Sequence, residues 1–296
     1  MRIDEKCAPT KKYEDGSCIL LKDIIDMANK WNNKNKNNKI IISDDKMAMI
    51  KQFEKFLSNK CSDQACWIRL DFVKQIENYD LLNNTFRPPG PVGKYEWLST
   101  TDIDNVINQY QSKYDDFLFL GAVPYDFESL KMLGIHNLNF KKLEKSGKNK
   151  IGMVINLDEH YKSGSHWVGL YTNLKENQIY YFDSVGVKPK KRIKKFINKI
   201  TKYLYNKSFN KNLDINSLYN VKYRNNNPNE ISKLLNNFDI RYNNIQHQFK
   251  DSECGVYSIH FITRLVDGES FTNIINNVIK DDKMNNFRKN YFINVN

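Results

Sequence analysis

Cys254 and Gly255 stand immediately before an apolar run that covers residues 256–262. This pattern predicts a loop that leads into a buried helix, with the thiol at the N-terminal end of that helix. The unpaired amides and the positive end of the helix dipole at such a position favour a thiolate, which is a strong nucleophile. The segment therefore contains a candidate catalytic nucleophile, Cys254. A packed core thiol is the alternative interpretation of the same residues.

Two neighbouring apolar runs are each flanked by a polar residue that could act in catalysis. One residue is a candidate base, and the other could orient that base. His166 begins the run 166–172, and Asp183 follows the run 178–182. The turn residues 175–177 predict that the two runs form a hairpin, which would bring His166 and Asp183 side by side. His166 would then take the proton of the thiol and return it to a leaving amine, while Asp183 would orient the imidazole. A structural histidine and a strand-end turn residue are the alternatives.

A glutamine, Gln248, precedes Cys254 with five residues between them. Its side-chain amide, together with the backbone N–H of Cys254, could stabilise the oxyanion that forms when a thiolate attacks a carbonyl. The order His166, Asp183, Gln248, Cys254 therefore predicts a cysteine enzyme that hydrolyses peptide or isopeptide bonds.

The rest of the chain is typical of an α+β protein with a small central sheet and helices on its faces. Strands are expected at residues 117–123, 151–157, 166–172, 178–182 and 239–246. Helices are expected at residues 17–31, 47–57, 99–114, 125–133, 189–205, 228–238 and 254–266, while 67–76 could be a helix or a strand. The Pro- and Gly-rich segment 87–93 predicts a boundary between an N-terminal helical arm, 1–90, and a catalytic domain, 91–296.

Composition indicates where in the cell the protein acts and whether it binds a membrane or a metal. The chain has 296 residues and a net charge of +12, and no apolar segment approaches the roughly 18 residues of a membrane span. The polar start carries no signal peptide, so we expect an intracellular protein with reduced thiols and no membrane partner. Four cysteines fall in the arm, and their spacing matches no common zinc site, so we expect no metal and no cofactor. They are Cys7, Cys18, Cys61 and Cys66.

The positive charge is spread along the chain, which favours a solvated basic surface over a dedicated nucleic-acid site. Its densest cluster, residues 188–202, has apolar residues at helical spacing and is explained by an amphipathic helix with its lysines turned outward. Non-specific contact with nucleic acid through this surface is the alternative.

These motifs together resemble the group of cysteine proteases that contains the SUMO-specific proteases and the adenovirus endopeptidase. The matching pieces are His166-Trp167, Asp183-Ser184 at a strand end, Gln248, and Cys254-Gly255, and Trp97-Leu98 before a capped helix also fits. The resemblance covers about 200 residues and implies a papain-like or adenain-like core. Some members use asparagine as the acid, whereas Asp183 matches the aspartate version.

The helical arm and the Pro- and Gly-rich segment resemble the large-DNA-virus branch of this group, typified by the African swine fever virus polyprotein protease. The resemblance implies that Trp97 and Trp167 flank a narrow channel that admits glycine on the acyl side of the scissile bond. It also implies cleavage at Gly-Gly-Xaa or Gly-Xaa-Gly sites in viral structural polyproteins during virion maturation. The host cytoplasm, in virus factories, and the virion are the implied locations.

Three other functions are compatible with the same residues. An isopeptidase that removes ubiquitin or SUMO-like tags would use the same four site residues, so the motif does not separate it from a polyprotein protease. An acetyltransferase could use the same trio, and would need sites for coenzyme A and a polyphosphate. A binding module without catalysis would lack at least one of the four site residues, and all four are present in this sequence.

Overall fold

The structure, a computed structural model, describes residues 6–210, 212 and 238–293. The chain divides into two compact units, which are described separately below. One contains the described residues through Val92 together with those from Lys289 onward, and the other is Gly93–Arg288. The helix expected at 228–238 falls almost entirely outside the described residues. Within the described ranges, no helix combines the length and the apolar character needed to cross a membrane.

The first unit is helical, as the sequence predicts. Its elements are α1 (Leu21–Lys34), α2 (Lys46–Leu57), α3 (Gln64–Trp67), α4 (Asp71–Lys74) and α5 (Tyr79–Asn83). The side chain of Asp45 accepts a hydrogen bond from the backbone of Ala48 and so caps α2. Trp31, Phe53 and Phe72 meet in one aromatic core between these helices. The ambiguous segment 67–76 contains no strand: it begins at the last residue of α3, passes through a turn, contains α4 and ends in a second turn.

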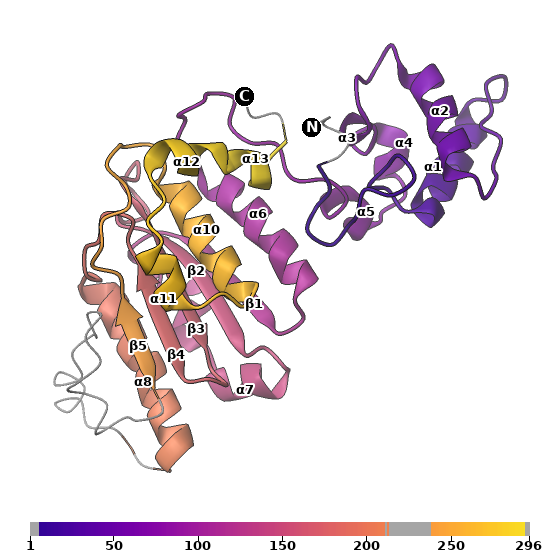
Figure 1. Ribbon diagram of the computed structural model, residues 1–296. Helices are drawn as coiled ribbons and strands as arrows, with labels where there is room; N and C mark the ends of the chain where they lie inside the picture. Colours follow the sequence, from indigo (N-terminus) through magenta and orange to yellow (C-terminus); the bar gives the residue numbers. More distant parts are fainter. Residues whose placement is uncertain (1–5, 211, 213–237, 294–296) are drawn as a thin grey trace. The chain divides into compact units, whose positions relative to one another are not determined.

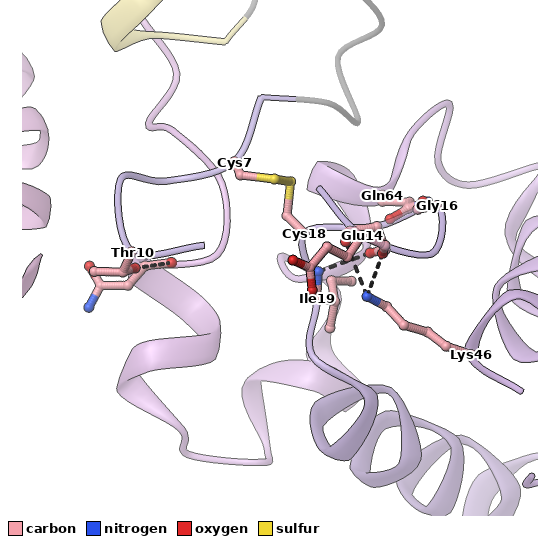
Figure 2. The surroundings of a disulfide bond; sticks show 10 residues. Cys7, Thr10, Glu14, Gly16, Cys18, Ile19, Lys46 and Gln64 are labelled. Carbon is pink, nitrogen blue, oxygen red and sulfur yellow. Dashed lines mark hydrogen bonds between the residues drawn. A yellow bond between two sulfur atoms is a disulfide. The ribbon is translucent and has the colours of Figure 1, made fainter. Parts of the chain in front are cut away.

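Two disulfide bonds close loops in this unit, which corrects the expectation of reduced thiols. Cys7 is bonded to Cys18, and Cys61 to Cys66, with Cα–Cα distances of 5.3 and 5.5 Å. These distances lie in the usual range for disulfides. Figure 2 shows that the loop before Cys18 is held by Lys46, whose ammonium donates to the carbonyl of Glu14 at 2.8 Å. The expectation was wrong because it inferred the redox state from a missing signal peptide, which carries no information on which sulfurs the fold brings together.

The second unit is built on a five-stranded mixed sheet in the order β1-β2-β3-β4-β5 (Figure 1). Its strands are β1 (Phe117–Val123), β2 (Lys150–Asn156), β3 (Trp167–Asn173), β4 (Gln178–Phe182) and β5 (Asp239–Tyr242). The β1–β2 and β4–β5 pairs are parallel, while β2–β3 and β3–β4 are antiparallel. The expected α+β fold with a small mixed sheet is confirmed, although β5 ends earlier than the sequence predicts.

Helices cover both faces of this sheet, because successive residues of a strand point to opposite sides. α10 (Cys254–Val266) and α6 (Thr100–Lys113) pack on one face, where Gly169 of β3 allows the ring of Phe261 to approach closely. On the other face Leu170 and Ile179 join an apolar cluster with residues of α8 (Lys191–Phe209). The amphipathic helices predicted at 99–114, 189–205 and 254–266 are therefore confirmed, and Ser99 caps α6 in a capping box with Asp102.

The helix expected at 125–133 is wrong. The segment forms turns and two short 3-10 helices, η2 (Lys131–Leu133) and η3 (Ile135–Asn137), with Gly134 in the left-handed conformation between them. Its start is held instead by the loop after β2, because the backbone of Tyr125 donates to the carbonyl of Asp158 at 2.8 Å. The unit also contains α7 (Phe140–Lys145), α11 (Phe271–Asn276) and α12 (Asp281–Asn286), and α13 (Arg288–Tyr291) follows.

Candidate active site

His166 and Asp183 lie at the same end of the β3–β4 hairpin. The strands are antiparallel, with Gly169 opposite Phe182, so the residue before β3 and the residue after β4 become neighbours. The Nε2 atom of His166 lies 2.8 Å from the Oδ1 atom of Asp183, and the carboxylate is buried. The same oxygen accepts a hydrogen bond from the backbone of Val185 at 2.9 Å. The hairpin prediction is confirmed, and with it the adjacency of the two side chains.

Asn243, which follows β5, holds the backbone of Asp183 from both sides. Its Oδ1 accepts from the backbone N–H of Asp183 at 2.8 Å, and its Nδ2 donates to the carbonyl of the same residue at 2.7 Å. Asn243 is fully buried. The carboxylate that meets His166 therefore stands on a fixed main chain. The sequence analysis missed this residue, and its place directly after a strand is the one signal that could have suggested it.

Cys254 is the first residue of α10 and carries a buried, free thiol. Its side chain lies close enough to the imidazole of His166 to raise the pKa of that ring. Because Nε2 of that ring faces Asp183, Nδ1 is the nitrogen left for the thiol. Burial by itself lowers the pKa of His166, but hydrogen bonds and charge interactions with Asp183 and Cys254 raise the pKa to about 9. The arrangement suits a protonated imidazole beside a nucleophilic sulfur.

Gln248 lies in the loop before α10 and is tied to the turn that follows β4. Its Oε1 atom lies 2.6 Å from the hydroxyl of Ser184, and its Nε2 donates to the carbonyl of Lys250 at 2.5 Å. Its backbone N–H also donates to the carbonyl of Ser184 at 2.9 Å. The structure thus joins His166, Asp183 and Cys254 directly, and it connects Gln248 to them through the residue next to Asp183.

Trp97 and Trp167 line one open pocket of about 600 Å³ in the second unit. The Trp167 indole is buried and donates from Nε1 to the carbonyl of Leu98 at 2.9 Å, whereas Trp97 is 48% exposed. Apolar residues of the segment wrongly expected to be helical, Leu130 and Leu133, also line the pocket. Trp167 directly follows His166 in the chain, but neither His166 nor Cys254 is among the residues that line this pocket.

Two further ionisable groups near the site have partners far away in the sequence. Glu253 is buried, and its carboxylate oxygens lie 3.1 and 3.3 Å from nitrogens of Arg288. His160 lies with Nδ1 2.6 Å from Asp126 and lines the pocket. In both cases the partner is more than 30 residues away in the sequence, which a local pattern does not report.

Gly255 allows the irregular segment around Leu98, just before α6, to pack against the N-terminus of α10. A Cβ atom at this position would lie 2.9 Å from Cβ of Leu98, so the segment that carries Trp97 would have to move. We expect Gly255→Ala to lower kcat/KM about tenfold, because overpacking a core typically costs about 1–3 kcal/mol. Peptide kinetics together with thermal melting test this, and unchanged values of both kcat/KM and Tm would contradict it.

The pKa of His166 predicts the alkaline limit of activity. With a pKa of about 9, the imidazole keeps the proton that a leaving amine needs up to about that pH, and activity should fall above it. The stabilisation that comes from this raised pKa is complete below the usual value of 6.5 and is lost as the pH rises through about 9. Asp183→Asn should move the alkaline limb of the kcat profile to lower pH. A limb that stays in place in this variant would show that Asp183 does not set the pKa of His166.

Comparisons with known proteins place this geometry in a family. Residues 146–296 match the family described as the Ulp1 protease family, C-terminal catalytic domain. The chain is 31% identical to a protein of Acanthamoeba polyphaga mimivirus that is named for thiol protease activity, over 97% of this chain and 93% of the relative. It is 26% identical to the SUMO-1 cysteine protease of African swine fever virus (isolate Pig/Kenya/KEN-50/1950), over 82% of this chain and 88% of the relative.

A solved structure agrees with these relationships at the level of the fold. The crystal structure of the African swine fever virus protease superposes with a TM-score of 0.62 at 22% identity, over 97% of this chain and 95% of that one. The likeness includes the helical elements that precede the sheet, because it covers nearly the whole chain. The family match and the mimivirus relative together show that the chain belongs to the Ulp1 protease family and is a thiol protease.

Proposed function

We propose that this protease is an endopeptidase that cuts protein precursors after glycine, at Gly-Gly-Xaa or Gly-Xaa-Gly sites. In this mechanism His166 already holds the thiol proton in a thiolate–imidazolium pair, and the sulfur of Cys254 attacks the scissile carbonyl carbon. The proton then passes to the leaving amine as the C–N bond breaks, which leaves a thioester on Cys254. Water, deprotonated by His166, attacks the thioester and releases the acyl product and the thiol.

The remaining site residues orient the imidazole and stabilise the charges that develop during the reaction. Asp183 holds the imidazole with Nδ1 toward the sulfur and stabilises the imidazolium that forms. Gln248 and the backbone N–H of Cys254 donate to the oxyanion of the tetrahedral intermediate, a contribution typically worth about 10²–10³ in rate per donor. The observation that carries this mechanism is the imidazole of His166, which lies 2.8 Å from the buried carboxylate of Asp183 and has its pKa raised by that group and by the buried thiol of Cys254.

The preference for glycine rests on the two tryptophans, one of which directly follows His166 in the chain. Trp97 and Trp167 both line one open pocket, and the Trp167 indole is fixed by its hydrogen bond to the carbonyl of Leu98. Two indoles beside an extended peptide leave little room for a Cβ atom on the acyl side of the scissile bond. A glycine, which has no Cβ, would pass between them without strain.

The natural substrate would be a viral structural polyprotein that is processed during virion maturation. This part of the proposal is supported by relatives in two large DNA viruses, one of which is described as a SUMO-1 cysteine protease. We infer that the protein acts in the host cytoplasm and is carried into the virion. The two disulfides in the first unit suit the virion, since disulfides persist in oxidising surroundings and are rare in the reduced cytosol.

The second candidate function is removal of a SUMO- or ubiquitin-like tag. The observation in its favour is the name of the African swine fever virus relative, which includes SUMO-1. Both functions use the same four side chains, so they differ in the surface that binds the substrate rather than in the chemistry. Basic residues on the outside of α8 leave non-specific contact with nucleic acid as a further property to test.

Matched substrates separate these functions. One peptide would carry Gly-Gly-Xaa, a second would carry Gly-Ala-Xaa at the same place, and ubiquitin and SUMO conjugates would form a parallel panel. We expect the first peptide to be cleaved at least tenfold faster than the second, and Trp97→Ala to reduce that difference. Cleavage confined to the conjugates would favour the isopeptidase, and equal cleavage of both peptides would contradict the glycine channel.

A further inference from the structure

We propose that Ser184 is a positioning residue, which orients the side-chain amide of Gln248 so that one of its N–H groups faces the oxyanion. This inference rests on the proposed oxyanion role of Gln248 and extends it to a residue that no motif singled out for chemistry. Ser184 directly follows Asp183, so one short turn would support both the group that orients the base and the group that stabilises the intermediate.

The hydrogen-bond partners of the Gln248 side chain determine which of its two terminal atoms is the nitrogen and which is the oxygen. The backbone carbonyl of Lys250 can only accept, so the atom 2.5 Å from it must be the amide nitrogen. The amide oxygen is then the atom that lies 2.6 Å from the hydroxyl of Ser184, and that hydroxyl must donate. One of the two N–H bonds of the amide is used by Lys250, and the second remains available for a substrate oxyanion.

The same serine also holds the main chain that carries Gln248. Its carbonyl accepts hydrogen bonds from the backbone N–H groups of His247 at 2.8 Å and Gln248 at 2.9 Å. Gly186, at φ +81°, allows the turn to approach the backbone of Ile245, to which a Cβ would come within 3.1 Å. Ser184 thus holds the glutamine by its backbone and by its side chain.

Burial makes this hydroxyl hard to replace. Ser184 is 1% exposed and Gln248 is 4% exposed, so bulk water has little access to the amide oxygen if the hydroxyl is removed. A buried acceptor without a donor is costly, and the amide would gain by rotating or shifting toward another donor. Either movement would take the free N–H away from the position of the oxyanion. The loss would appear in the transition state, where that charge develops, rather than in substrate binding.

The experiment is a double-mutant cycle on the peptidase reaction with a Gly-Gly-Xaa peptide. We expect Ser184→Ala to lower kcat about tenfold to a hundredfold with KM nearly unchanged. Gln248→Ala should lower kcat by about 10²–10³, and the double variant should be no slower than Gln248→Ala alone. Affinity for a peptide aldehyde, whose adduct with the thiol carries an oxygen at the oxyanion position, should fall by the same factor as kcat.

A matched variant separates positioning from general damage to the core. Thr201 also has a buried hydroxyl, which donates to the carbonyl of Ile197 within α8, and Thr201→Val should leave kcat and aldehyde affinity unchanged. Ser184→Cys retains a weaker donor of similar size and should give an intermediate kcat. This variant also keeps the test decisive if Ser184→Ala does not fold.

The outcomes distinguish this inference from the function on which it rests. If Gln248→Ala leaves kcat intact, the proposed oxyanion role of Gln248 fails. If Gln248→Ala is slow while Ser184→Ala and Ser184→Cys turn over at the normal rate, the positioning role of Ser184 alone is overturned. Losses that multiply in the double variant would also overturn it, because they would show that the two residues act independently.

Discussion

Replacing Cys254 with alanine should abolish peptide cleavage, with a loss of about 10⁶ in kcat. In the proposed mechanism the sulfur forms the thioester, and in the structure it lies close enough to the imidazole of His166 to raise the pKa of that ring. Without it, His166 and Asp183 remain adjacent but have no nucleophile to activate. The measurement is turnover of a Gly-Gly-Xaa peptide at high enzyme concentration, with thermal melting to show that the variant is folded.

Cys254→Ser provides the matched control for this result. The hydroxyl keeps the size of the side chain and its hydrogen bonding, so the fold should be retained, but an alcohol is a far weaker nucleophile at neutral pH. We expect turnover by Cys254→Ser to be barely detectable. Measurable cleavage by Cys254→Ala near the normal rate would exclude the mechanism proposed here.

Replacing Arg288 with methionine should destabilise the second unit by about 3–5 kcal/mol, because it would leave the buried carboxylate of Glu253 without its partner. Both side chains are almost completely buried, and Nη2 of Arg288 also lies 3.4 Å from the carbonyl of Ser252. Arg288 therefore binds both residues that directly precede Cys254, Ser252 and Glu253. Urea unfolding monitored by tryptophan fluorescence would measure the change in the free energy of unfolding.

Two further variants make this test specific to the buried charge. Glu253→Gln combined with Arg288→Met removes both charges and should recover most of the lost stability, as for other buried pairs. Lys113→Met breaks the partly exposed ion pair with Asp267 and should change stability by less than about 1 kcal/mol. If the double variant were as unstable as Arg288→Met alone, the loss would come from packing and not from an unpaired charge.

Local patterns in the sequence were sufficient for the parts of the site that lie at the ends of regular elements. His166 and Asp183 flank two short apolar runs that are separated by turn residues. If these runs form a hairpin, the two residues lie next to each other. The start of α10 at Cys254 follows from the apolar run after it. The strands likewise follow from short apolar runs separated by turn residues, and α8 follows from apolar residues at helical spacing.

Residues that act through distant partners could not be predicted in this way. Asn243 is 60 positions from the residue whose backbone it holds, and Ser184 is 64 positions from its glutamine. Ser184 directly follows Asp183 and Asn243 directly follows a strand, but neither position indicates which distant residue the side chain binds. The segment 125–133 failed for a related reason, because bonds to the loop after β2 outweigh its helical pattern. Local propensity is a weak guide wherever tertiary hydrogen bonds compete with it.

The pairing of four cysteines in the first unit changes how chemical labelling of this protein can be interpreted. All five cysteines lie in the described ranges, and Cys254 is the free one among them. A thiol reagent added to the oxidised chain would therefore count catalytic centres at one equivalent per molecule, without removal of other cysteines. A strong reductant added to protect the nucleophile would open both cross-links, so the choice of assay buffer determines whether the arm under study is still cross-linked.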